Sequence, residues 1–142
     1  MKTLKITKAD LNERNEYTRS RDLEFEGHIE VEASLGLVSV LGFIRAAGGL
    51  SIEAGSSIEA GESIEAGLSI EAGLSIEARE SIKAGLSIRC KAKLTVKLRI
   101  FAGLCTWRLP KPEEQIIECA ELTQGTVCFG ELKLLPAKTE AA

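Results

Sequence analysis

The chain has 142 residues, the usual size of a single domain and enough to bury a core. Charged residues make up 27%, the net charge is −3 and only 4% of the residues are aromatic, so no nucleic-acid surface is expected. The sequence has no apolar run of about 18 residues and no secretory leader, so we expect a cytoplasmic protein without a membrane segment.

Residues 1–22 are strongly charged and precede any repeat. Thr7 is a candidate N-cap for a short helix that extends to Tyr17. Repeat structures expose unpaired strand edges at both ends unless another segment covers them. We therefore expect residues 1–22 to form a cap over the repeats that follow.

A six-residue period starts at Leu23. The early inward positions are predicted to be Leu23, Ile29, Leu35 and Leu41, each followed two residues later by Phe25, Val31, Leu37 and Phe43. From Leu50 the units read LSIEAG, SSIEAG, ESIEAG and so on, with Ile at every sixth position from Ile52 to Ile88. The step from Leu41 to Ile52 is one residue short of two units, which predicts a bulged or irregular corner near residues 46–49.

The period excludes a helix. Six helical residues rotate by about 600°, so the Ile side chains would spread over three sides, and each Gly would cost a further ~1 kcal/mol. In a strand, by contrast, the Ile and Ala of Ser-Ile-Glu-Ala point to one side and Ser and Glu to the other. The Gly and the residue after it supply a bend. The sequence therefore predicts four-residue strands joined by two-residue corners.

The corner residues indicate how many strands make one coil. The pair Gly-Leu recurs every eighteen residues, at 49–50, 67–68, 85–86 and 103–104. A twelve-residue coil would instead mix Leu with Glu in one column. The predicted fold is therefore all-β: a three-sided parallel β-solenoid over residues 23–106, with eighteen residues per coil and short terminal caps. Its stability is expected to come from the stacking of inward Ile and Ala between coils.

This pattern resembles the hexapeptide-repeat parallel β-helix proteins, which are three-sided and usually left-handed. The resemblance covers roughly residues 23–104. The family prefers a small residue two places before the inward aliphatic residue, whereas this chain has Leu or Glu there. Because stacked inward Glu62 and Glu80 would be costly, we expect this position to lie outside, at the corners.

The resemblance also implies one possible activity, because acyl transfer with a catalytic His between the subunits of a trimer is the best-known activity of the family. The single histidine of this chain is His28, next to Ile29. It could project outward as such a base would, but the simpler interpretation is a solvent-facing residue of a repeat. We predict no catalytic residue, no cofactor and no metal ligand.

The segment 107–142 departs from the repeat after Trp107, at Leu109-Pro110-Lys111-Pro112. The stretches QIIECAEL and TVCFGELKLL predict two strands around Thr123-Gln124-Gly125, a hairpin-like cap followed by a loose tail. The cysteines, Cys90, Cys105, Cys119 and Cys128, form no CxxC pair. Small buried hydrophobic residues are therefore the favoured interpretation, with a disulfide or a metal site as the alternative.

A step of eighteen residues also groups the outward side chains into vertical columns. The predicted columns are Glu53–Glu71–Arg89, Glu59–Glu77–Thr95 and Glu65–Lys83. A solvated, partly self-paired face is the favoured interpretation, and a carboxylate column that collects Ca²⁺ is the alternative.

The remaining feature is apolar: Leu50, Leu68, Leu86 and Leu104 fall in one corner column. Either this column is an exposed ridge for a partner or for self-association, or each Leu folds back over the core. We therefore predict a non-enzymatic structural or protein-interaction module, a possible homo-oligomer, with no nucleic-acid, membrane or small-molecule partner. A minimal acyltransferase-like enzyme is the alternative, and near-identical repeats that arose by recent expansion or by design are a third.

Overall fold

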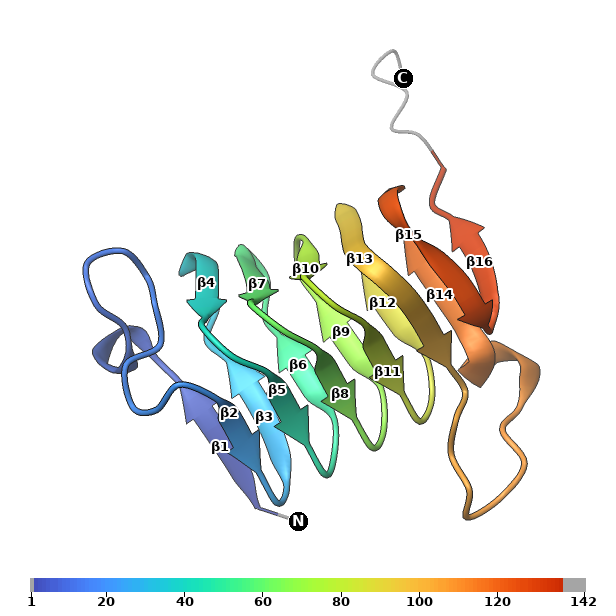
Figure 1. Cartoon of the computed structure of the whole chain (residues 1–142), viewed down its shortest axis with the longest axis horizontal. Coiled ribbons are helices and arrows are strands. Elements are labelled where there is room, and N and C mark those ends of the chain that lie inside the picture. The colour runs from blue at the N-terminus through green and yellow to red at the C-terminus, as the bar shows by residue number, and fades with distance from the viewer. Residues whose placement is uncertain (1, 137–142) are drawn as a thin grey trace.

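The computed structural model describes residues 2–136, and in this part the chain forms sixteen strands and two short 3₁₀ helices. The strands wind around one axis from the N-terminal to the C-terminal end (Figure 1). Neighbouring strands pair in parallel throughout, as the register of the central strands illustrates. The predicted all-β parallel solenoid is confirmed.

The strands lie on three faces. Face A is formed by β1 (Thr3–Ile6), β3 (His28–Val31), β6 (Leu50–Ile52), β9 (Ile70–Ala72), β12 (Ile88–Cys90), β14 (Ile116–Cys119) and β16 (Glu131–Leu134). Face B contains β4 (Gly36–Val40), β7 (Ser56–Ala60) and β10 (Ile76–Ala78), and face C contains β2 (Leu23–Phe25), β5 (Ile44–Ala46), β8 (Ile64–Ala66) and β11 (Ile82–Ala84). The long strands β13 (Lys93–Ala102) and β15 (Glu121–Phe129) each run along face B and continue onto face C.

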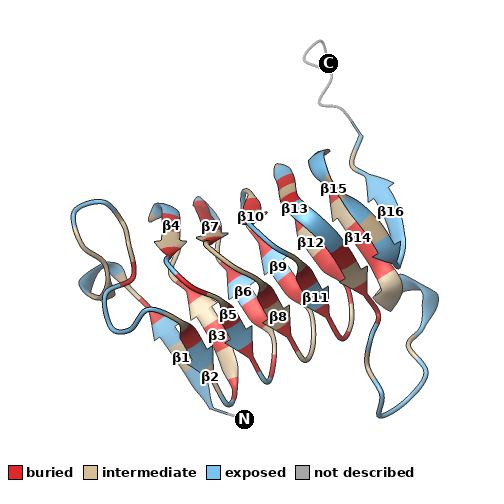
Figure 2. Cartoon of the chain, in the orientation of Figure 1, coloured by how far each residue is buried: buried red, intermediate tan, exposed pale blue. Residues whose placement is uncertain are grey.

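The central coils contain eighteen residues, as predicted. Ile76 lies opposite Ile58 in one neighbouring coil and Leu94 in the other, and all three side chains are fully buried. The position two residues later is occupied by small side chains, such as Ala78. Figure 2 shows this alternation as buried segments along the strands on every face. The core is therefore a set of vertical ladders of Ile and Ala.

The first coils are longer than eighteen residues, and here the prediction of which residues face inward is wrong. Ile29 lies opposite Leu50, 21 residues later, and Leu50 lies opposite Ile70, 20 residues later. The inward side chains between them are Val38, Val40, Ile44 and Ala46. Of the predicted inward residues, Leu37 and Leu41 are 48% and 60% exposed, while Leu35 and Phe43 are half-buried.

The extra residues are inserted at two corners rather than near residues 46–49. At the first, Ser34 and Gly36 adopt φ values of 60° and 76°, and at the second, Gly55 adopts 80°. The buried hydroxyl of Ser56 joins the two insertions, because it donates to the carbonyl of Glu32 at 2.6 Å and accepts from the N–H of Leu35 at 2.9 Å. These left-handed turns lengthen the coil while each strand keeps its inward alternation.

Residues 7–22 fold across the N-terminal end. The predicted helix is limited to one 3₁₀ turn, η1 (Lys8–Asp10), preceded by Thr7 as N-cap. The N–H of Tyr17 donates to the carbonyl of Ser39 at 2.8 Å, and Leu11 forms a bridge to Tyr17. Tyr17 is only 8% exposed, so it closes this end of the core.

The C-terminal segment is not a hairpin. After a loop and the 3₁₀ helix η2 (Pro112–Gln115), β14 pairs with β12 and β16 pairs with β14, in parallel. The turn signal at Gly125 marks a corner with φ of 127°, at which β15 bends from face B to face C without reversing. The predicted loose tail falls mainly on residues 137–142, outside the described part of the chain.

Candidate interaction surfaces

The predicted leucine column is only partly formed. Leu50 is 1% exposed because it occupies an inward position of β6. Leu68 and Leu86 are half-buried vertical neighbours, since the N–H of Leu86 donates to the carbonyl of Leu68 at 3.3 Å. In the next coil it is the N–H of Gly103 that donates to the carbonyl of Leu86, so Leu104 is displaced from the column and is 38% exposed.

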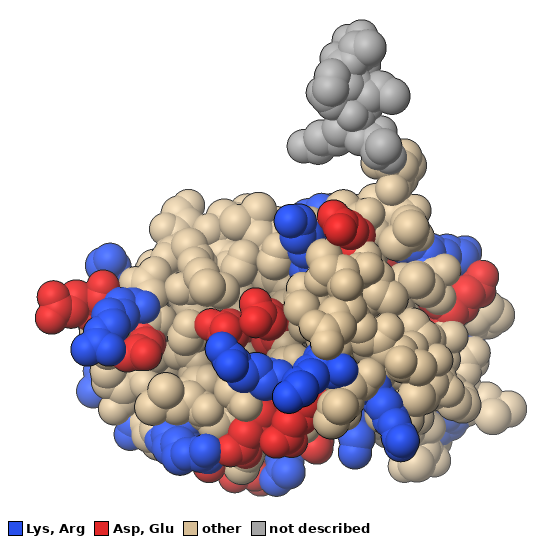
Figure 3. Space-filling model, turned by 45° about the horizontal axis from the view of Figure 1, so that its top comes forward, with Lys and Arg blue, Asp and Glu red and all other residues tan. Residues whose placement is uncertain are grey.

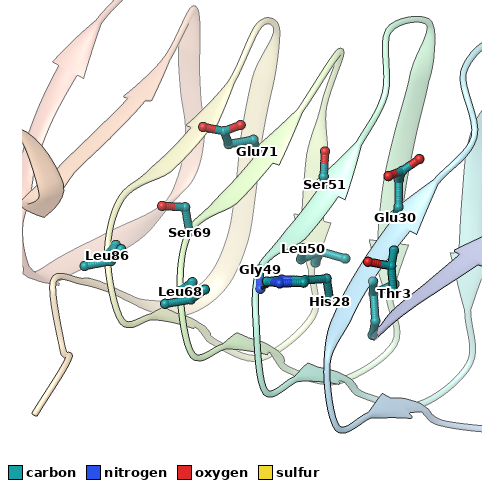
Figure 4. Close-up of a pocket in the computed structure, with 11 residues that line it drawn as sticks. Thr3, His28, Glu30, Gly49, Leu50, Ser51, Leu68, Ser69, Glu71 and Leu86 are labelled. Carbon is teal, nitrogen blue, oxygen red and sulfur yellow. Dashed lines mark hydrogen bonds between the residues drawn. The ribbon is translucent and has the colours of Figure 1, made fainter. Parts of the chain in front are cut away.

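The corner that carries Leu68 and Leu86, which we call the leucine corner, has a shallow hollow on either side. The hollow on face A has a volume of about 400 Å³ and is lined by both leucines, His28 and outward Ser and Glu side chains (Figure 4). The hollow on face C has about 320 Å³ and contains Leu104 and Trp107 in its wall. The leucine corner is thus a narrow apolar strip rather than a continuous ridge along the prism.

His28 lies at the edge of the face A hollow. Its Nδ1 accepts a hydrogen bond of 2.9 Å from the N–H of Gly49 in the next coil. In this arrangement the neutral ring carries its proton on Nε2 and presents a donor to solvent. The nitrogen that could accept a proton is therefore already occupied, which is a poor arrangement for a general base.

Outward charges pair along the columns of the solenoid. On face C, Arg45 lies between Glu24 at 3.1 Å and Glu65 at 3.4 Å, and the ammonium of Lys83 lies over the ring of Phe101. Figure 3 shows the same mixture of signs in small clusters, separated by uncharged surface. Neighbouring charges of opposite sign favour a solvated, partly self-paired surface.

The predicted columns are confirmed where coils contain eighteen residues. Glu71 lies beside Arg89, and Glu65 lies beside Lys83. Glu53 is not in the first of these columns, because the insertion at Gly55 puts Ser51 opposite Glu71 instead.

One column brings two like charges together on face B. Glu59 and Glu77 are direct neighbours in the register of β7 and β10. Burial first, and then the charge of Glu59, raise the pKa of Glu77. A hydrogen bond from Ser39 at 2.9 Å and an ion pair with Arg79 at 3.7 Å hold the Glu59 carboxylate. Two carboxylates without a third ligand do not define a metal site, and no cluster of three metal-binding side chains occurs among residues 2–136.

The two ends of the solenoid differ in how far their inward side chains are buried. At the N-terminal end, Ile6 and Leu23 are 1% and 2% exposed. At the C-terminal end, the inward register positions Leu132 and Leu134 of β16 are 37% and 59% exposed. In the described part of the chain no strand pairs with the outer edge of β15 or β16, nor with that of β1 or β2, so the ends differ in the burial of their inward side chains and not in their strand edges.

We call this last coil, β15 and β16, the open end. Leu122 and Val127 of β15 also occupy inward register positions and are only partly buried. The sequence signal for it was present in the alternation of ELKL, but the segment was assigned to a hairpin, in which both strands would have paired with each other. The open end combines apolar side chains with free backbone donors and acceptors, which is the usual composition of a strand-pairing surface.

The cysteines do not form disulfides in this structure. Cys90 and Cys119 are buried at small inward positions, Cys105 is half-buried and Cys128 is exposed. Desolvation, with the neighbouring Cys119 as the next cause, raises the pKa of the Cys90 thiol to about 12, so this thiol stays protonated at neutral pH. The favoured interpretation as buried hydrophobic residues is confirmed for Cys90 and Cys119.

Comparison of the chain with family models, with curated proteins and with solved structures gave no match. No helix in residues 2–136 has the length and apolar character needed to cross a bilayer.

Proposed function

We propose that this chain is a non-enzymatic structural module that associates with other chains of its kind through the open end of its solenoid. The observation that carries the proposal is a contrast in burial: the inward side chains Ile6 and Leu23 of the first coil are almost fully buried, whereas Leu132 and Leu134 of the last coil are exposed beside two free strand edges. Uncovered strand edges above an apolar core favour pairing with another strand.

The leucine corner supports self-association less strongly. Leu50 lies in the core and Leu104 is displaced, so only Leu68 and Leu86 remain in the column, and both are half-buried. A strip of two side chains offers little apolar area compared with the roughly 800 Å² per partner of a standard interface.

Sedimentation velocity over a wide concentration range tests the proposal. We expect the wild-type chain to sediment with a mass above the 15.3 kDa of one chain, and Leu132→Lys to shift it towards the monomer. The double variant Leu68→Ser and Leu86→Ser is the matched control and should keep the wild-type mass. A wild-type monomer at every concentration would refute the proposal, whereas a loss of mass only in the control would move the contact to the leucine corner.

The acyltransferase alternative has less support, because the N–H of Gly49 occupies Nδ1 of His28. Binding of acyl-coenzyme A by the wild-type chain, lost on His28→Ala, would favour that alternative over a structural role.

A further inference from the structure

We propose that the open end binds the open end of a second copy of the same chain, and that β16 pairs antiparallel with its copy about Leu132. This inference rests on the proposed function and names its partner and register. Three features of the last coil carry it: the direction of the free backbone groups, the inward leucines and the outward charges.

The backbone of β16 presents defined groups to the outside. The N–H of Leu135 donates to the carbonyl of Cys119 on β14 at 2.8 Å. In a strand, the N–H and C=O of one residue point to the same edge, and the edge alternates from one residue to the next. The N–H and C=O of Lys133, two residues before Leu135, therefore also face β14. The N–H and C=O of Leu132 and Leu134 therefore face the free edge. In an antiparallel pair centred on Leu132, this residue and its copy therefore exchange two hydrogen bonds: each donates its N–H to the carbonyl of the other.

The side chains favour the same register. Leu132 occupies an inward position opposite Ile117, and Glu131 and Lys133 occupy the exposed outward positions on either side. An antiparallel pair about Leu132 stacks Leu132 on its copy and puts Glu131 opposite Lys133 of the second copy, twice because of the two-fold symmetry. Opposite charges at directly facing positions stabilise a strand pair, and self-complementary patches of this kind are typical of two-fold dimers.

The same two-fold axis brings the rest of the open end together. It places the face B half of β15 against the face C half of the second β15, and so it brings Leu122 towards Val127 of the second copy. The partly exposed inward residues of all three faces then become buried between two apolar coils. A single pairing thus covers every free edge of the last coil.

Other occupants and registers fit less well. A shift by one residue would put Lys133 opposite Lys133 of the second copy, and like charges at facing positions destabilise a strand pair. Head-to-tail stacking would pair β16 with the free edge of β1 and would bring Lys133 opposite Lys5, a pair of like charges. Residues 137–142, AKTEAA, contain no apolar side chain larger than Ala and do not match the exposed leucines.

A charge-reversal experiment tests the register. We expect Glu131→Lys and Lys133→Glu each to raise the dimer dissociation constant about tenfold or more, since each creates two like-charge pairs. The double variant restores both opposite-charge pairs and should return to within about threefold of wild type. Sedimentation equilibrium at low and at high salt measures these constants, and the differences should shrink at high salt. Both substituted positions, Glu131 and Lys133, are exposed, so circular dichroism should show unchanged β content.

Cysteine cross-linking gives a second readout in a Cys128→Ser background. Leu132→Cys should form an intermolecular disulfide, because a facing antiparallel pair has Cα atoms about 5.5 Å apart. Leu134→Cys is the matched control and should not cross-link, because two such residues would lie several residues apart along the pair.

The outcomes separate this inference from the proposed function. If the wild-type chain associates but the double charge variant stays as weak as the single ones, or if Leu134→Cys cross-links in place of Leu132→Cys, the register is wrong and self-association stands. If the wild-type chain is monomeric throughout, both proposals are refuted.

Discussion

Replacement of Ile76 by Ala is the most direct test of the stacked core. The substitution removes three buried carbon atoms between Ile58 and Leu94, all of which are fully buried. Transfer of the lost atoms accounts for about 2.4 kcal/mol at ~0.8 kcal/mol per carbon. The cavity adds to this, because parallel pairing holds the neighbouring coils about 4.8 Å apart and prevents collapse. We expect a total loss of about 4 kcal/mol in the free energy of unfolding.

Urea unfolding monitored by circular dichroism, at one fixed protein concentration, measures this loss. Leu98→Ala is the matched control in a neighbouring position: Leu98 is 50% exposed, so its truncation should cost less than about 1 kcal/mol. A cost below about 1 kcal/mol for Ile76→Ala as well would show that residues eighteen apart do not support one another, and the account of the core would be wrong.

Three further predictions follow from particular contacts. Burial first, and then the charge of Glu59, raise the pKa of Glu77 in the fold, so the stability that its protonated form contributes is complete below its unfolded-state pKa and is lost as the pH rises. Glu77→Gln removes both the buried charge and the repulsion at pH 7, and should therefore raise the free energy of unfolding there by about 0.5 kcal/mol, with no gain below about pH 4; urea titrations at both pH values measure this. Cys128 should react with a thiol reagent in the native protein and Cys90 only after denaturation, measured by mass spectrometry; rapid labelling of native Cys90 would contradict its burial. Gly85→Ala should lower stability by about 1–3 kcal/mol in the same urea assay, because a Cβ there would lie 2.0 Å from a carbonyl oxygen of the previous coil, and an unchanged midpoint would contradict this close approach.

The repeat itself could be predicted from sequence, because each six-residue unit has to bury the same two inward side chains and then turn a corner. Inward Ile and Ala every six residues define the strand faces, and the Gly-Leu corners every eighteen residues define the coil. The vertical contact between Leu68 and Leu86 follows from that period and is present in the structure. Where the units are regular, the pattern contains all the information needed for the register.

The sequence could not predict which residues of the first coils face inward, because two alternating apolar patterns overlap there. Leu35 and Leu37 fit the inward pattern as well as Val38 and Val40 do, and a slip of one residue reverses the faces of a strand. The left-handed turns at Ser34 and Gly55 decide between the two patterns, and the six-residue period does not predict how many residues these turns contain. The same error placed Leu50 at a corner, although it belongs to the core.

The open end was missed for a related reason. Gly125 after Thr123 and Gln124 is a turn signal, and a turn signal between two apolar alternating segments usually indicates a hairpin. In a solenoid the same residues make a corner, because β13 offers β15 a parallel partner on both sides of the bend, with register shifts between the paired stretches. Local sequence specifies the bend, whereas the strand that is available for pairing is a property of the whole fold.

The difference between the ends also determines what kind of assembly can form. A solenoid with two uncovered ends would stack head to tail, and repeated stacking of that kind gives an open fibre. Here Tyr17 packs into the core beside β4, so the N-terminal end exposes less apolar surface than the last coil, although β1 and β2 are also edge strands. Two chains that pair through their open ends leave only the N-terminal ends outermost, where Ile6 and Leu23 are already buried, so we expect the assembly to stop at two chains. The mass of the wild-type protein should therefore level off at twice the 15.3 kDa of one chain, and continued growth with concentration would mean that the N-terminal end also joins.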